Sequence, residues 1–154
     1  MKILNPTIEI IPQSEGIEGI YKQVELAGRT CYQSFENITK DSARKFTDRM
    51  MKSGHCGMLE HATIYLKAEE IEKLDNNGHA FFINPLERYN YNKYSEVSIY
   101  DFTLYVTTNL RVLFENNWMD DLKYLCEPTK YHEKRITIRM TTDIGVTREG
   151  NRHK

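Results

Sequence analysis

The chain has 154 residues, which is about the size of one domain and enough to bury a hydrophobic core. Apolar residues make up 40% and charged residues 28%, and the formal net charge is -1. This composition excludes a disordered tail and a broadly basic nucleic-acid binder, so any anion binding must be local. Three cysteines without CxxC spacing, and no secretory leader, favour reduced thiols in a cytoplasm. No apolar run approaches the ~20 residues that span a bilayer, so we expect a single cytoplasmic domain, 1–154, without a membrane partner.

The first half of the chain predicts a strand, two helices and a second strand. Residues 3–11 are β-branched and apolar around a proline, which is typical of an edge strand. Apolar residues then recur at helical spacing over 17–27, with Gly28 as the expected stop. A second helix begins near residue 39 or 41 and ends at Gly54, a residue type that tolerates a left-handed cap. Residues 61–68 alternate between apolar and polar, which predicts a strand with one buried face.

The middle of the chain is less regular. Residues 69–73 are helix-prone up to an Asn-Asn-Gly stop at 76–78, and 81–94 has no clear assignment. Residues 97–106 predict a strand, and the apolar spacing over 110–125 predicts one or two helices that end before a proline.

The C-terminal part predicts a strand over 135–142, with Asp143 as the N-cap of a helix from Ile144 to the terminus. The order of these elements lacks the steady βαβ alternation of a wholly parallel sheet. We therefore expect an α+β fold with a mainly antiparallel sheet and packed helices.

The first candidate site lies in the predicted C-terminal helix. Its spacing places Arg148 and Arg152 on one helical face and Glu149 and His153 on the next. A guanidinium holds phosphate bidentately and a carboxylate accepts from an imide or a ribose hydroxyl, so this set suits a nucleotide. A solvated charged helix face is the simpler interpretation.

Other candidates are weaker. His55, Cys56 and His61 are metal-ligand types, but their spacing is poor for a closed zinc site, so we expect no metal. Arg29 follows the first helix and would lie near an anion or on the surface. Cys31 would need a nearby base to act as a nucleophile, and no sequence feature provides one.

The aromatic and basic residues at 88–94 belong to a chain with ten tyrosines. They have the composition of a stacking platform for single-stranded bases, but core or interface tyrosines are the simpler interpretation for a chain without positive excess. We therefore expect no nucleic-acid partner.

The strongest signal comes from three short segments taken together. They are AGRTCY at 27–32, GHCGMLEH at 54–61 and GVTREGNRHK at 145–154. The middle segment resembles the Gly-His-x-x-x-x-Glu-His segment of the flavin-dependent thymidylate synthases, with a helix before it and a strand after it. The last resembles the lead into that family's signature, which is Arg-His-Arg followed by a serine-rich stretch and another arginine.

This resemblance implies an α+β enzyme, generally a homotetramer, that binds FAD and dUMP. It implies that NADPH and methylenetetrahydrofolate serve as co-substrates in making dTMP. Reduced flavin delivers hydride in this family, which requires no cysteine nucleophile. The implied cofactor-binding residues are His55, Gly57, Arg152, His153 and Lys154, and the implied substrate-binding residues are Glu149 and Arg152.

The chain also departs from the family pattern. Lys154 replaces the second arginine of the triplet, and Gly57 stands where a hydroxyl residue is common. The region between the second and third segments is long, which we interpret as an insertion around 69–132. The sequence stops at Lys154, inside the signature, so we expect an incomplete domain that binds FAD or dUMP weakly and whose activity is open. The alternative is a non-catalytic oligomerisation or nucleotide-sensing module derived from the same fold.

Overall fold

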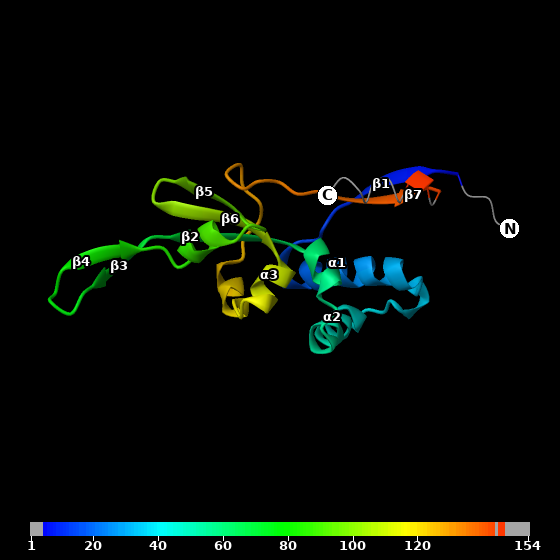
Figure 1. Cartoon of the computed structure of the whole chain (residues 1–154), viewed down its shortest axis with the longest axis horizontal. Helices are drawn as coiled ribbons and strands as arrows, with labels where there is room; N and C mark the ends of the chain where they lie inside the picture. The colour runs from blue at the N-terminus through cyan, green and yellow to red at the C-terminus, as the bar shows by residue number, and fades with distance from the viewer. Residues whose placement is uncertain (1–4, 144, 147–154) are drawn as a thin grey trace. The chain divides into compact units, whose positions relative to one another are not determined.

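A computed structural model describes residues 5–143, 145 and 146, and it confirms the predicted α+β class. Every strand pairing within the described residues is antiparallel (Figure 1). The helices are α1 (Gly16–Tyr32), α2 (Ser42–Ser53) and α3 (Leu110–Glu115). Four short 3-10 helices are η1 (Phe35–Asn37), η2 (Cys56–His61), η3 (Glu87–Tyr91) and η4 (Met119–Tyr124). The strands are β1 (Thr7–Ile11), β2 (Thr63–Glu69), β3 (Ile71–Leu74), β4 (Ala80–Ile83), β5 (Glu96–Tyr100), β6 (Thr103–Asn109) and β7 (Thr137–Thr141).

The chain divides into two compact units. One unit contains Gln13–Arg135, and the other combines Met1–Pro12 with Ile136–Lys154. The first unit holds every apolar residue of the described core. No described helix has the length and apolarity that crossing a membrane requires. Whether the chain acts as a single domain remains a prediction.

The larger unit is built on a three-stranded sheet in the order β2-β6-β5. The predicted alternation in β2 is confirmed, because Ile64, Leu66 and Ala68 are buried while Lys67 and Glu69 are exposed. In the paired strand, Val106 lies opposite Leu66 and is fully buried. This face of the sheet carries the hydrophobic core.

The central strand β6 is buried on both faces, because the segment after η4 crosses the second face. The ring of Tyr131 stacks on Tyr100, with ring centroids 4.3 Å apart. The ring of His132 lies edge-on to both Tyr65 and Tyr105, each at 5.3 Å. Two hydrogen bonds hold this segment on the sheet. Ser98 Oγ donates to the Tyr131 carbonyl, and Thr107 Oγ1 donates to the Glu133 carbonyl at 2.9 Å.

The helical layer contains one correction. The first helix does not stop at Gly28 but continues to Tyr32. A Cβ at Gly28 would lie 2.2 Å from Cζ of Phe46 in α2, so this glycine lets the two helices pack closely. The second helix ends as predicted, with Gly54 as a left-handed cap at φ 72°.

Two more expectations were wrong. Residues 69–73 do not form a helix, because β2 ends there and β3 begins a hairpin with β4, whose turn contains Asp75 and Gly78. The strand over 97–106 is interrupted at Asp101 and Phe102, which have φ of 48° and 57° and form the turn between β5 and β6.

The region 69–132, which we interpreted as an insertion, contributes strands and a helix to the larger unit. It includes β5, β6 and α3, so the central strand of the sheet comes from within 69–132. The side chain of Asn109 caps α3 by accepting a hydrogen bond from the Val112 amide at 3.1 Å. The hydroxyl of Tyr89, a fully buried residue, donates to Asp121 at 2.9 Å.

The smaller unit contains a two-stranded sheet. Strand β1 pairs with β7 in a register that places Ile8 opposite Met140 and Ile10 opposite Ile138, and these four side chains are exposed. The N-cap role predicted for Asp143 is confirmed, because its Oδ1 accepts from the amides of Gly145 and Val146 at 2.8 and 3.1 Å. The rest of that predicted helix lies outside the described residues.

Candidate functional site

The first two sequence segments of the candidate site meet in the structure. Tyr32 is the last residue of α1, and His55 follows the Gly54 cap of α2. The Tyr32 hydroxyl and Nδ1 of His55 are 3.2 Å apart. When the imidazole is neutral with its hydrogen on Nε2, the tyrosine donates this bond. Two segments separated by 23 residues in the chain thus share one surface.

The backbone around His55 explains its position. The amide of His55 donates to the Met50 carbonyl at 3.0 Å, which closes the end of α2. The left-handed Gly54 turns the chain outward, and the His55 side chain is exposed. Its Nε2 has no hydrogen-bond partner among the residues that the structure describes, so it faces solvent as a potential donor.

Gly57 lies in the first turn of η2 and is exposed. No atom lies within 4 Å of the Cβ that another residue would carry there, so the backbone is open to a ligand. The same short helix is anchored by Leu59, which is fully buried. The exposed part of this segment is therefore held on the core.

Glu60 has a partner that the sequence did not reveal. Arg111 of α3 forms an ion pair with Glu60 and a second one with Glu115, in which Nε and Oε1 are 2.7 Å apart. These two carboxylates raise the pKa of the Arg111 guanidinium. His61, the next residue, is exposed. The motif carboxylate is therefore neutralised by the chain itself.

Arg29 is not available to an anion, contrary to one interpretation, and it is not on the surface either. Its Nη2 lies 2.8 Å from Oε1 of Glu25, a residue that is 3% exposed. The other carboxylate oxygen accepts from Ser42 Oγ at 2.8 Å. The guanidinium also lies 4.8 Å from the ring centroid of Phe46. These contacts give Arg29 a structural role between α1 and α2.

The three cysteines are unpaired, and burial disfavours the thiolate of one of them. Cys31, Cys56 and Cys126 are all free thiols. Burial raises the pKa of the Cys126 thiol, so it stays protonated at neutral pH. Within the described part of the chain, no three histidine, cysteine or carboxylate side chains gather as a metal site would require.

The tyrosine-rich segment 88–94 is partly buried and partly exposed. Tyr89 is fully buried, and the Arg88 guanidinium pairs with Asp121 and lies 4.8 Å from the Trp118 ring centroid. Tyr91 and Tyr94 are exposed. The core interpretation is therefore confirmed for Tyr89.

The C-terminal candidates cannot be placed. Glu149, Arg152, His153 and Lys154 lie outside the described residues, so their expected proximity to His55 remains a prediction. The described part of the candidate site therefore consists of Tyr32, His55 and Gly57. Glu60 lies three residues after Gly57 and pairs with the distant Arg111 of α3.

Comparison with known proteins finds similarity over part of the chain. Residues 16–74 match the family model described as thymidylate synthase complementing protein, so this part of the chain is similar to that family. The chain is 31% identical over 93 residues to a flavin-dependent thymidylate synthase of Corynebacterium glutamicum. This match covers 56% of the chain and 37% of the relative, so the chain spans just over a third of the length of that relative. No solved structure matches the chain.

Proposed function

We propose that the chain contributes to a flavin-dependent thymidylate synthase, in which dUMP is methylated to dTMP. The observation that carries the proposal is the Tyr32–His55 contact, because it joins two of the family-like segments inside the matched residues 16–74. The proposal includes FAD as cofactor, with NADPH and methylenetetrahydrofolate as co-substrates. It also includes a cytoplasmic homo-oligomer, a tetramer as in the family.

The described residues fit the polar edge of a flavin. His55 offers an exposed Nε2 donor, and Gly57 offers backbone that no side chain covers. When bound, reduced FAD would supply the hydride that completes the new methyl group. The chain's own groups would bind and orient the ring, while Arg111 would hold the negative charge of Glu60 in place. In this proposal the remaining contacts come from Glu149, Arg152, His153 and Lys154.

FAD titration of the purified protein, followed by flavin fluorescence, tests the proposal. Replacing His55→Ala removes one hydrogen bond and should weaken FAD binding by about 2- to 10-fold. Tyr32→Phe should have a smaller effect in the same direction, because it only releases the imidazole. His79→Ala is the matched control, since His79 is exposed in the β3–β4 turn and bonds to Asp75. Equal FAD affinity in wild type and His55→Ala would overturn the assignment of this site.

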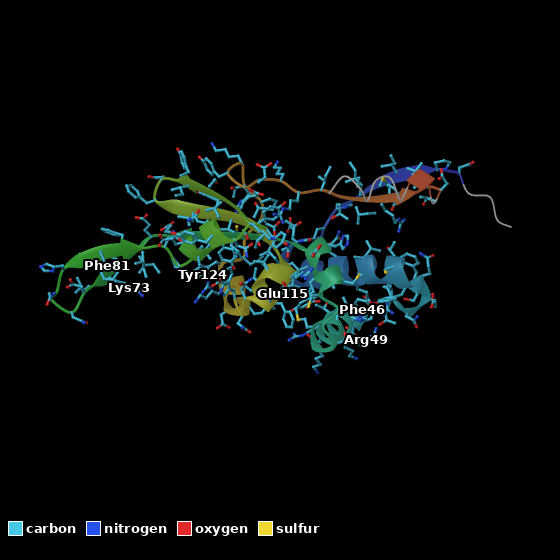
Figure 2. All side chains as sticks on the ribbon, viewed as in Figure 1. Phe46, Arg49, Lys73, Phe81, Glu115 and Tyr124 are labelled. Atoms are coloured by element: carbon cyan, nitrogen blue, oxygen red, sulfur yellow. The ribbon has the colours of Figure 1, made fainter. Side chains whose placement is uncertain are left out.

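The alternative, a non-catalytic oligomerisation or nucleotide-sensing module, is favoured by one observation. The β3–β4 hairpin exposes Leu74, Phe81 and Phe82, which lie on both of its faces. Figure 2 shows Phe81 in the hairpin, well away from Phe46 in the helical layer. Self-association without FAD binding, measured by light scattering, would support this alternative. Oxidation of NADPH that depends on dUMP would exclude it.

A further inference from the structure

The outer face of α2 carries a concentration of positive charge that the candidate flavin site does not use. Four cations, Arg44, Lys45, Arg49 and Lys52, are all exposed, while the net charge of the whole chain is -1. None of the four forms an ion pair with any residue that the structure describes. Asp48 is the one carboxylate among them on this face.

The helix geometry explains why these charges gather. The buried residues Ala43, Phe46, Thr47 and Met50 occupy one side of α2. At 100° per residue, positions 44 to 52 that are not buried fall on the opposite side and extend about 12 Å along the axis. The Arg49 guanidinium lies 5.3 Å from the ring centroid of the buried Phe46, which limits its freedom.

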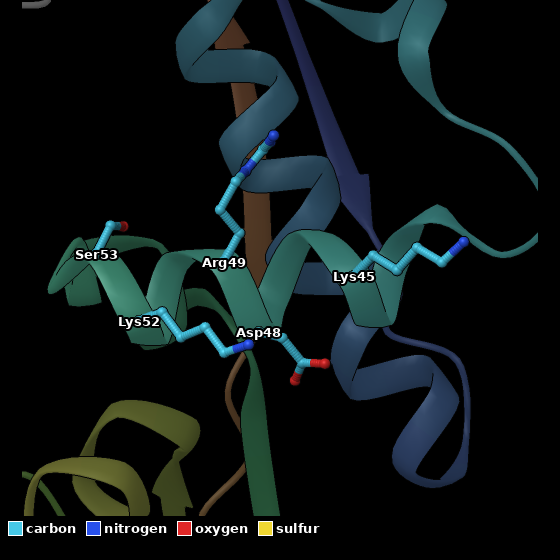
Figure 3. Close-up of a pocket in the computed structure, with 5 residues that line it drawn as sticks. All are labelled: Lys45, Asp48, Arg49, Lys52 and Ser53. Carbon is cyan, nitrogen blue, oxygen red and sulfur yellow. The ribbon is translucent and has the colours of Figure 1, made fainter.

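A shallow depression of about 430 Å³ lies on this face and is lined by Lys45, Asp48, Arg49, Lys52 and Ser53. Figure 3 shows these side chains extending from one helix in different directions instead of converging on a point. A single phosphate could therefore contact few of these cationic side chains. A ligand with several linked anionic groups could contact more of them.

We propose that the outer face of α2 binds a small polyphosphate group, such as the di- or triphosphate of a nucleotide. Charge complementarity favours this ligand, because a cationic face of about 12 Å matches a short phosphate chain and its sugar. A long nucleic-acid strand fits less well. The one aromatic residue of α2, Phe46, is 2% exposed, so the helix offers no ring on which bases could stack.

The four cations are not equivalent. Lys52 lies in the last turn of α2, where a cation also stabilises the negative end of the helix dipole. Lys45 and Arg49 lie further from that end and line the depression, which Arg44 does not, so they should contribute most of the binding. Asp48 should weaken the binding of any anion. The proposal requires no flavin and does not depend on the proposed function.

Calorimetric titration of the protein with sodium triphosphate at low salt tests the proposal. Lys45→Ala and Arg49→Ala should each weaken triphosphate binding by about 2- to 5-fold, as expected for exposed charges, and Asp48→Asn should strengthen it. Alanine favours helix, so these variants should fold, which circular dichroism checks. Lys73→Ala is the matched control because Lys73 lies in the β3–β4 hairpin, far from Arg49 (Figure 2).

Two comparisons separate this ligand from other anions. Inorganic phosphate should bind more weakly than triphosphate, and oligodeoxythymidine should bind no more tightly as its length increases. The proposal is overturned if triphosphate does not bind, or if Lys73→Ala costs as much affinity as Arg49→Ala. Length-dependent oligonucleotide binding that Arg49→Ala weakens would also overturn it and indicate a nucleic-acid surface instead.

Discussion

Arg29 and His132 are ionisable side chains whose polar atoms are occupied within the fold. Arg29 pairs with Glu25 between the first two helices. Nδ1 of His132 accepts from the Thr129 amide at 3.0 Å, and Nε2 lies 3.1 Å from the Leu66 carbonyl. Because Nδ1 accepts the first bond it carries no hydrogen, and the second bond places the hydrogen on Nε2, so the buried ring is neutral. Both residues therefore stabilise the folded protein.

Removing the guanidinium of Arg29 should destabilise the protein strongly. Arg29→Ala leaves the Glu25 carboxylate buried without its charge partner, which costs about 3 kcal/mol of unfolding free energy. Urea unfolding measures the change. Lys22→Ala on the exposed side of the same helix should stay within about 0.5 kcal/mol of wild type. A loss for Arg29→Ala no larger than this control would show that the pair is not structurally important.

His132 should make stability depend on pH. Burial lowers the pKa of His132 below its usual value of about 6.5, so the unfolded chain binds a proton more readily than the folded chain. Stability should therefore be complete above the unfolded pKa and decrease as pH falls through it towards the folded pKa. Urea midpoints measured between neutral and mildly acidic pH should show this decrease. His132→Asn should reduce the slope, and an unchanged slope would contradict the assignment.

At the scale of elements, the contact between α1 and α2 depends on Gly28. The glycine lies in the sequence segment that resembles a functional motif, yet its role here is close packing against Phe46. Phe46 is 2% exposed and lies beneath both Arg29 and Arg49, so its ring has little room to move. This explains why a residue expected to end the helix is found within it.

Gly28→Ala should therefore destabilise the protein although alanine favours helix. The clash with Phe46 is expected to cost about 1 to 3 kcal/mol, against a gain of about 1 kcal/mol in helix propensity. Thermal unfolding should show a lower midpoint. Gly57→Ala is the matched control, because nothing lies within 4 Å of its added Cβ. A higher midpoint for Gly28→Ala would contradict the packing role.

The elements that could be predicted are those with a clear local signal. Strand β2 follows from its period of two, and the end of α2 follows from Gly54. The predictions that were wrong concern residues whose conformation is set by tertiary contacts. Gly28 lies within a helix because it packs against Phe46, and residues 71–73 are strand because they pair with β4. Composition and spacing do not contain either interaction.

At the scale of the whole molecule, the two units differ in how their apolar surface is used. The apolar core lies within 13–135, whereas the β1–β7 sheet leaves Ile8, Ile10, Ile138 and Met140 exposed. Isolated two-stranded sheets are marginally stable in water. Each unit should therefore open with its own free energy.

Hydrogen exchange should resolve this difference. Amides of β6 should exchange slowest, because this strand is paired on both sides and buried on both faces. Amides of β1, β7 and the β3–β4 hairpin should exchange much faster. Mass-spectrometric or NMR exchange measures all of them in one experiment. Equal protection of β7 and β6 would show that the exposed sheet is covered in solution.

The candidate site was predictable only in part for a similar reason. The resemblance named His55 and Gly57 as candidate residues, in a short segment that also contains Glu60. It could not identify Arg111, which lies 51 residues after Glu60 and has no motif of its own. A long-range ion pair leaves no local pattern, so only the fold reveals it.

The Glu60–Arg111 pair limits how the matched region can be exchanged between proteins. Residues 16–74 contain the motif carboxylate, but its cation comes from α3, outside that span. A chimera that transplanted only the matched region into a relative would carry an acid without its counterion. The transferable module is therefore longer than the sequence match, and its boundary lies beyond Glu115.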